Sequence, residues 1–265
     1  MYIGALLKTA VRIAERAGAL LLKNFRGVRR IGFKRGEGNL VTDMDHASEE
    51  LIVRALRRAF PDHAIVAEER GASGDSPFRW HIDPLDATAN YAHGFPHWCV
   101  SIGPEDRIGV VYNPNGPEMF AAEAGRGAWR NGRRIHVSRQ SRLDRAFLAT
   151  GFSYHPAAKR RNLDYFARFL TRAGAIRRAG SAALDLSYVA AGVFDGFWEF
   201  GLGTWDLAAA VVIAREAGAR VTAFDGGPFV LRTGEALATN GRLHAAMIAT
   251  LARRLPTGGT RAACR

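Results

Sequence analysis

The sequence predicts a mixed α and β protein, on three observations. Amphipathic stretches with a helical period alternate with short apolar runs along most of the chain. In the middle of the chain, Gly, Pro and Asn separate apolar runs of strand length, a pattern typical of antiparallel hairpins. The 265 residues suffice for one large domain or two closely packed halves, and an apolar fraction of 48% supports a substantial core.

The first half begins with helical periodicity and then changes to strand-like runs. Apolar residues recur every three or four positions in the N-terminal segment, with Lys, Arg and Glu between them. Pro84 biases the residue before it toward extended backbone, so a strand is expected to end at Asp83. The predicted helices are Met1–Phe25 and Ala47–Phe60, and the predicted strands are Val28–Lys34, Ala64–Ala67, Trp80–Asp83, Cys99–Ile102, Ile108–Tyr112, Met119–Glu123, Gly127–Arg130 and Arg134–Val137.

In the second half, strands and helices alternate, which favours an α/β arrangement. The predicted boundaries are residues 1–140 for an N-terminal α+β half, 141–255 for a C-terminal α/β half and 256–265 for a loose tail. The predicted helices are Asn162–Arg172, Leu184–Ala191 and Leu207–Ala217, and the predicted strands are Phe147–Thr150, Ile176–Arg178, Phe194–Phe200 and Arg220–Thr222.

The segment Trp80–Asn90 carries the most informative chemistry. Asp83 and Asp86 lie three residues apart around Pro84, and carboxylate oxygens of this kind suit Mg²⁺. If a helix starts near Thr88, the backbone N–H groups of Ala87 and Thr88 form an anion site at its positive end. The alternative is a polar turn with a capping Asp, which is the commoner meaning of an isolated motif of this length.

Other carboxylates follow predicted strand ends or precede predicted helices. Glu68 comes directly after an apolar run, and Asp45 precedes the second helix. Asp206 stands near the start of a long apolar helical stretch, where a simple N-cap is the alternative explanation. Together these positions predict a cluster of acidic side chains at the ends of several elements.

Composition narrows the functional classes. The net charge of +12 comes almost wholly from Arg in scattered pairs, so most of these side chains are expected to lie on solvated faces, where a basic rim would attract phosphorylated substrates. Binding to RNA or another polyanion is the alternative. Cys99 and Cys264 do not indicate a disulfide framework. No long apolar run and no signal-peptide layout is present, so we expect a soluble cytoplasmic protein without a membrane partner.

The motifs resemble the inositol monophosphatase family, in particular its bacterial branch, in the family's order and at about its spacing. The resemblance implies a layered αβαβα sandwich of the sugar-phosphatase type and, as a family habit, a homodimer. It covers nearly the whole chain. The matching segments are Asn39–Asp45, Ala67–Glu69, Trp80–Asn90, Ala149–Phe152, Gly180–Asp185 and Trp205–Gly218.

The resemblance also implies a site and a reaction. Two or three Mg²⁺ ions would be held by Glu68, Asp83, the carbonyl of Leu85, Asp86 and Asp206. Glu68 and Thr88 would orient the attacking water, with Asp45 holding the Thr88 hydroxyl. The matching positions for phosphate and substrate hydroxyls are Asp86, Ala87, Thr88, Ser181, Ala182 and Glu199, with Arg177 or Arg178 reaching the same pocket.

Two of these assignments have structural alternatives. Glu199 follows apolar Phe197 and Trp198, so it could be an outward carboxylate on an alternating strand. Arg177 and Arg178 could be an exposed pair.

This chain departs from the family pattern at a few positions. Ala87 stands where the family almost always has Gly, and a positive φ there would cost roughly 1 kcal/mol for Ala. Ala89 replaces a usual Thr, Thr204 a usual Pro and Ala219 a usual Gly. All the proposed metal ligands remain, so activity is still expected.

The resemblance predicts a lithium-sensitive, Mg²⁺-dependent phosphatase acting on inositol 1-phosphate or a similar small polyol or sugar phosphate. Fructose 1,6-bisphosphate, histidinol phosphate and adenosine 3′,5′-bisphosphate are alternative substrates within the same family. A phosphatase with a nucleophilic Asp in a D-x-D motif is disfavoured, because the spacing here is D-x-x-D. A non-enzymatic alternative is a weakly active member that binds RNA or RNA polymerase as a partner.

Overall fold

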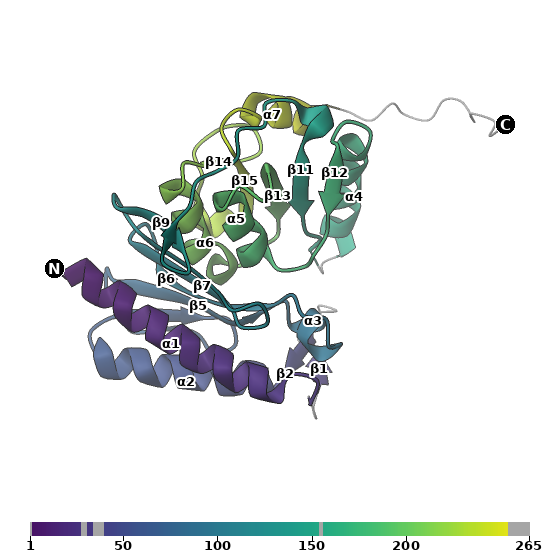
Figure 1. Cartoon of the computed structure of the whole chain (residues 1–265). Coiled ribbons are helices and arrows are strands. Elements are labelled where there is room, and N and C mark those ends of the chain that lie inside the picture. Colours follow the sequence, from purple (N-terminus) through teal and green to yellow (C-terminus); the bar gives the residue numbers. More distant parts are fainter. Residues whose placement is uncertain (1, 28–30, 34–39, 154–155, 254–265) are drawn as a thin grey trace.

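The computed structural model describes residues 2–27, 31–33, 40–153 and 156–253. Figure 1 shows five layers: α1 (Tyr2–Asn24) and α2 (Asp43–Ala59), a first sheet, α5 (Ala182–Ala190) and α6 (Thr204–Glu216), a second sheet, and α4 (Pro156–Leu170) with α7 (His244–Ala252). This is the αβαβα sandwich that the resemblance implies. The predicted tail at residues 256–265 lies outside the described residues.

Two neighbouring helices and a large sheet form the first part of the chain. The sheet has eight strands in the order β10-β9-β8-β7-β6-β5-β3-β4, and β3 pairs with β5 in parallel while the other pairs are antiparallel. The elements are α1 Tyr2–Asn24, β1 Ile31–Phe33, β2 Leu40–Thr42, α2 Asp43–Ala59, β3 Ala64–Ala67, β4 Gly71–Ser73, β5 Arg79–Asp86, α3 Thr88–Ala92, β6 Cys99–Pro104, β7 Ile108–Asn113, β8 Glu118–Glu123, β9 Gly127–Arg130 and β10 Arg133–Arg134.

A capping box moves the start of α2 four residues ahead of the predicted start at Ala47. The Thr42 hydroxyl accepts from the N–H of Met44, and the Asp45 carboxylate accepts from the N–H of Thr42. The apolar periodicity begins only after this polar first turn, so it could not reveal the true start. The capping box also fixes Asp45, which faces the functional site described below.

The second part of the chain builds a smaller sheet with the order β12-β11-β13-β15-β14. Strand β11 is parallel to β12 and β13, whereas β15 is antiparallel to β13 and β14. The elements are the 3₁₀ turn η1 Leu143–Arg145, β11 Phe147–Thr150, α4 Pro156–Leu170, β12 Ala175–Arg177, α5 Ala182–Ala190, β13 Gly196–Phe200, α6 Thr204–Glu216, β14 Arg220–Thr222, η2 Leu231–Thr233, β15 Glu235–Thr239 and α7 His244–Ala252.

Helix α6 is apolar on all sides because it lies between the two sheets. Its residues from Leu207 to Ala214 are all buried, as expected for a helix with no solvent face. Small side chains let it approach the first sheet closely. A Cβ atom added at Gly109 of β7 would lie 2.1 Å from the carbonyl oxygen of Ala209. This close packing carries Asp206, in the first turn of α6, to the ends of β5 and β6.

Several predicted boundaries are wrong or incomplete. Strand β5 does not end at Asp83 but continues to Asp86 through an irregular register. The predicted strand Arg134–Val137 is replaced by the two-residue β10, and α4 begins before Asn162 and ends at Leu170. Strand β15 and helix α7 were not predicted. Helix α7 has no side-chain N-cap, and thus lacks the usual start signal.

The division of the chain into halves remains a prediction. The first sheet ends at Arg134 and the second begins at Phe147, but α5 and α6 contact strands of both sheets. Within the described residues, none of the helices combines the length and the apolar character that a membrane span requires. Cys99 is buried and free, and Cys264 lies outside the described residues.

Candidate metal and phosphate site

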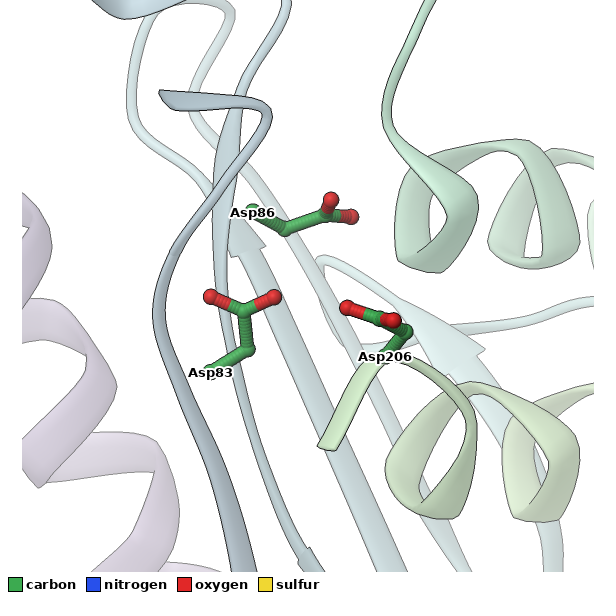
Figure 2. A group of neighbouring side chains, drawn as sticks. All are labelled: Asp83, Asp86 and Asp206. Atoms are coloured by element: carbon green, nitrogen blue, oxygen red, sulfur yellow. The ribbon is translucent and has the colours of Figure 1, made fainter. Parts of the chain in front are cut away.

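Three carboxylates converge where β5 ends and α6 begins. Asp83 and Asp86 belong to β5, and Asp206 lies in the first turn of α6. One oxygen of each lies within 4.8 Å of the others, and Figure 2 shows the three side chains pointing into a common space. Segments more than a hundred residues apart in the sequence therefore build one acidic cluster.

An irregularity at Pro84 explains how both acids of β5 reach the same space. Residues three apart in a regular strand point to opposite faces of a sheet. Here Asp83 pairs with Ser101 and Asp86 with Cys99, so three steps along β5 match two steps along β6. Pro84 cannot donate to the ladder, and a bulge is a usual place for proline in a sheet. The extra residue turns Asp86 to the side of Asp83.

Each of the three carboxylates is held by backbone or side-chain donors. Oδ1 of Asp83 accepts from the N–H of Leu85 at 3.0 Å, and Oδ2 of Asp206 accepts from the N–H of Gly203 at 2.6 Å. The N-cap of α6 is Gly203 and not Asp206, which is the third residue of the helix and accepts from the backbone of the N-cap residue. Oδ2 of Asp86 accepts from the Ser181 hydroxyl at 2.6 Å and from the N–H of Ala183 at 2.9 Å.

The cluster is electrostatically unfavourable when no cation is bound. Asp83 and Asp86 are only 2% and 7% exposed. Burial raises the pKa of Asp83 well above its usual range, and the neighbouring carboxylates raise it further. Burial also raises the pKa of Asp86, against the lowering effect of its hydrogen bonds. Hard oxygen donors that repel one another in this way are suited to a divalent cation.

The acids line a cavity of about 190 Å³ between the two sheets. Glu68 lies on its wall together with Leu85, Ala87 and Thr88 of the β5–α3 turn. Ala182 and Glu199 line it from the second half of the chain. The predicted residues therefore come together around one space, with three exceptions described next.

Ser181, Asp45 and Arg177 are not among the described residues that line this cavity. Ser181 is fully buried behind Asp86, to which it donates its hydroxyl proton. Arg177 is exposed, and its guanidinium lies over the ring of Phe147 at 4.8 Å. Its neighbour Arg178 lines the cavity instead. Of the predicted pair, only Arg178 lines the cavity.

Asp45 reaches the site through Thr88. The Thr88 hydroxyl donates to Oδ1 of Asp45 at 2.7 Å. The other oxygen of Asp45 accepts from the N–H and the hydroxyl of Thr42, at 2.7 and 2.6 Å. Asp45 is fully buried, and burial raises its pKa. A hydroxyl held in this way is oriented with its lone pairs toward the cavity.

Ala87, between Asp86 and Thr88, adopts the left-handed conformation with φ 73° and ψ 50°. Its side chain prefers negative φ, and the left-handed region costs a non-Gly residue roughly 1–2 kcal/mol. The strain lies at the residue whose N–H is the proposed phosphate donor. The conformational cost expected for Ala at this position therefore applies to this chain.

Replacing Ala87 with Gly is expected to stabilise the protein by about 0.5–1 kcal/mol, after allowing for the greater freedom of Gly in the unfolded chain. Any phosphatase activity should rise, because Gly lacks the methyl group that would lie beside a phosphate bound at this turn. Arg26→Gly is the control, since Arg26 is exposed and also has positive φ, 68°. Unfolding temperatures and phosphate release check both variants. Activity that rises equally in the control would contradict this explanation.

Glu199 is not an outward carboxylate. All residues of β13 are buried, and Glu199 is 7% exposed. A Cβ atom added at Gly151 would lie 2.1 Å from its carboxylate oxygens, so the absent side chain of Gly151 leaves room for this acid. Burial raises the pKa of Glu199 well above its usual range, and nearby Asp185 raises it further.

The structure also reveals supporting residues that the sequence did not indicate. The Ser48 hydroxyl donates to the carbonyl of Pro84 at 2.8 Å, at the bulge itself. Glu49 accepts from the N–H of Glu69 at 2.8 Å, next to Glu68. Both lie on α2 among ordinary polar residues, and no sequence signal distinguishes them. They fix the backbone that carries the acids.

Without divalent cations, the protein is expected to lose stability as the pH rises from about 4 to about 7. The pKa of Asp185 in the folded protein is about 6, raised mainly by burial, and those of Asp83 and Glu199 are raised too. At these carboxyl groups the folded state therefore binds more protons than the unfolded state in this window, and their contribution to stability falls as the protons leave. Buried His81 and His244, whose pKa values are lowered to about 4, oppose part of this fall. Saturating Mg²⁺ should oppose the fall. Unfolding temperatures measured across this range in EDTA and in Mg²⁺ test this, and parallel curves would contradict it.

Comparison with known proteins places this chain and its architecture in a family. The model of the inositol monophosphatase family matches residues 4–256. A Synechocystis protein named inositol-1-monophosphatase is 44% identical over 253 residues, 93% of this chain and 88% of that protein. A Pseudomonas aeruginosa protein named Nus factor SuhB is 41% identical and covers 95% of this chain and 97% of its own length.

Solved structures agree with the sequence relatives. An inositol monophosphatase from Anabaena (Nostoc) superposes with a TM-score of 0.85 at 40% identity, covering 95% of this chain and 96% of that one. The extragenic suppressor protein SuhB from Bartonella henselae gives a TM-score of 0.90 at 36% identity, covering 95% of this chain and all of that one. The chain belongs to the inositol monophosphatase family.

Proposed function

We propose that this protein is a Mg²⁺-dependent phosphomonoesterase acting on inositol 1-phosphate or a similar small polyol or sugar phosphate. The observation that carries this proposal is the convergence of Asp83, Asp86 and Asp206 beside the turn at Ala87 and Thr88. Membership of the family supports a phosphatase activity.

The donor set fits Mg²⁺. Asp83, Asp86 and Asp206 supply carboxylate oxygens within 4.8 Å of one another, and Glu68 and Leu85 line the same cavity. Mg²⁺ usually takes one or two carboxylates per ion and leaves its other positions to water and phosphate, so five protein groups suit two or three ions. When bound, such ions would neutralise the acids and the substrate phosphate and lower the pKa of a coordinated water.

The side chains of this protein have distinct tasks in the proposed reaction. Glu68 and the Thr88 hydroxyl orient the attacking water, and Asp45 fixes the Thr88 hydroxyl as its hydrogen-bond acceptor. The backbone N–H groups of Ala87 and Thr88 hold the phosphate in place. The water oxygen would form a new bond to phosphorus, in line with the bond to the alcohol oxygen that breaks, and one proton of the water would pass to the departing alcohol. No phosphorylated Asp is formed in this step.

The cavity favours a small alcohol as leaving group. Its volume of about 190 Å³ is below the roughly 300–1,000 Å³ typical of sites for drug-sized ligands. Polar groups of Asp86, Ala182 and Glu199 line it and would contact the hydroxyls of a polyol, and Arg178 would meet an anionic group at its edge. These polar contacts suit the hydroxyls of a compact polyol phosphate.

The test is phosphate release from inositol 1-phosphate, fructose 1,6-bisphosphate, histidinol phosphate and adenosine 3′,5′-bisphosphate. Each substrate is assayed with Mg²⁺, with EDTA, and with Mg²⁺ plus Li⁺. We expect Mg²⁺-dependent and Li⁺-sensitive hydrolysis, fastest for inositol 1-phosphate. No turnover of any substrate by folded protein would sink the proposal, and an aspartyl-phosphate trapped on Asp83 or Asp86 would sink the mechanism.

A second candidate function is binding to RNA of the transcription apparatus. Relatives from Pseudomonas aeruginosa and Escherichia coli are named Nus factor SuhB, and the chain carries a net charge of +12. Two adjoining hollows of about 420 and 330 Å³ lie between α1 and α2. They are lined by two arginine pairs at one-turn spacing, Arg12 with Arg16 and Arg54 with Arg58.

These arginines could neutralise phosphates along a nucleic-acid backbone. RNA binding that falls steeply with salt, persists in Asp83→Asn and weakens in Arg54→Ala with Arg58→Ala would support this second function. Absence of RNA binding at physiological salt would count against it. The two candidate functions use different faces of the molecule, so each can be tested alone.

A further inference from the structure

Asp83 lies on the first sheet and Asp206 on the helical layer next to it. A hydrogen bond between two other side chains, each two residues before one of these acids, joins the two layers. Nδ1 of His81 on β5 lies 2.9 Å from Oγ1 of Thr204, the first residue of α6. His81 precedes Asp83 by two residues, and Thr204 precedes Asp206 by two. A single hydrogen bond therefore joins the two backbones next to both acids.

The location of this bond on the sheet is specific. Residues two apart on a strand share a face, so His81 and Asp83 point the same way. His81 pairs with Gly103 on β6, and a Cβ atom added at Gly103 would lie 3.1 Å from the Cβ of Ala209 on α6. Helix α6 therefore lies directly on this face of the sheet. His81 is 5% exposed, so water competes little for its bond.

A second hydrogen bond holds the same turn of α6. The Ser101 hydroxyl on β6 donates to the carbonyl oxygen of Trp205 at 3.2 Å. Ser101 pairs with Asp83 across the ladder. Two polar contacts thus fix the first turn of α6 against β5 and β6, beside the position of Asp83.

The middle of α6 offers no comparable directional restraint. Its residues from Leu207 to Ala214 are apolar and buried, and hydrophobic packing is non-directional. Small shifts of the helix along the sheet would preserve most of that contact but would change the separation of Asp83 from Asp206. Polar contacts also hold the far end of the helix, where the Glu216 carboxylate accepts from the N–H groups of Gly125 and Gly127 and Arg215 pairs with Asp106. The hydrogen bonds at the first turn are the ones that hold α6 beside the acids.

We propose that the His81–Thr204 hydrogen bond, supported by Ser101, is a positioning device that sets the separation of Asp83 and Asp206 and so favours Mg²⁺ over larger cations. This inference rests on the proposed function. Mg²⁺ demands near-ideal geometry at 2.0–2.1 Å, whereas Ca²⁺ accepts flexible sites at 2.3–2.6 Å. A less fixed distance between Asp83 and Asp206 therefore lowers the affinity for Mg²⁺ more than the affinity for Ca²⁺.

The test measures metal binding directly. Wild type, Thr204→Val and His81→Phe are stripped with EDTA, and the unfolding temperature is followed as MgCl₂ or CaCl₂ is added, which yields an apparent dissociation constant for each ion. We expect both variants to bind Mg²⁺ about 3–10-fold more weakly, the range set by one hydrogen bond. Ca²⁺ affinity should change by less than about twofold. Thr204→Ser keeps the hydroxyl and should bind Mg²⁺ about as tightly as wild type.

The control is Thr222→Val. Thr222 contacts Nε2 of buried His244 at 3.0 Å in the second sheet, so the variant loses the same kind of bond away from the acids. It should lower stability without changing the ratio of Mg²⁺ to Ca²⁺ affinity. If Thr204→Val does not fold, His81→Phe and Ser101→Ala carry the same comparison.

If the variants bind Mg²⁺ and Ca²⁺ equally more weakly, or bind both with unchanged affinity, the inference is overturned while the proposed function stays intact. Wild-type protein that binds neither ion would overturn the proposed function and the inference together. A selective loss of Mg²⁺ affinity in Thr204→Val and His81→Phe, absent from Thr222→Val, supports the positioning role of the His81–Thr204 hydrogen bond.

Discussion

Asp83→Asn is expected to abolish Mg²⁺-dependent phosphate release, with a loss of about 10³-fold or more, and at the same time to raise the unfolding temperature of the metal-free protein. Asp83 is a proposed ligand at the centre of the acidic cluster, so its loss removes charge that would hold the cation. The same charge is buried among other carboxylates and raises the pKa of Asp83. Removing it relieves repulsion in the empty cluster.

The asparagine also preserves local structure, because its Oδ1 can accept from the N–H of Leu85 as Asp83 does. Circular dichroism, EDTA and Mg²⁺ melting curves and phosphate release distinguish the two effects. Asp164→Asn is the matched control, since Asp164 is an exposed carboxylate on α4. A variant that retains Mg²⁺-dependent turnover, or one that is destabilised without metal, would contradict the role given to Asp83.

Thr88→Val is expected to lower kcat by about 10²–10³-fold while Mg²⁺ affinity stays within about threefold of wild type. Valine has the shape of threonine but lacks the hydroxyl that Asp45 orients at 2.7 Å. Correct orientation or deprotonation of a reacting group commonly contributes 10²–10⁴-fold. The metal-binding carboxylates are untouched, so binding of the ion should persist.

Thr88→Ser keeps the hydroxyl and should retain most of the activity, which separates chemistry from packing. Asp45→Asn should lower kcat too, and combining it with Thr88→Val should add little, because the two residues act as one unit. Steady-state kinetics and Mg²⁺ melting curves provide the readouts. Full activity in Thr88→Val, or additive losses in the double variant, would contradict the proposed arrangement.

The sequence predicted the ingredients of the site better than their arrangement. The acids of the Trp80–Asn90 segment, with Glu68 and Asp206, were identified from strand ends and a helix start, and the structure brings them to one cavity. The extra residue at Pro84 could not be read from the sequence. Register depends on the partner strand β6 as well as on β5 itself.

Other parts of the account depended on contacts between distant segments. The paired arginines could not be separated by sequence, because which one faces the cavity depends on where β12 ends, and it ends at Arg177. The hydrogen bond from Thr88 to Asp45 spans 43 positions. The five-layer order came from the resemblance, since periodicity alone gives only a mixed α and β protein.

The central claim is that the converging acids hold Mg²⁺ beside a phosphate. Its most direct test is the unfolding temperature of EDTA-stripped wild-type protein, titrated with Mg²⁺ in the presence and absence of inorganic phosphate. The account predicts that Mg²⁺ raises the unfolding temperature, that phosphate lowers the Mg²⁺ concentration required, and that Asp83→Asn loses both effects. No stabilisation by Mg²⁺, with or without phosphate, would contradict it.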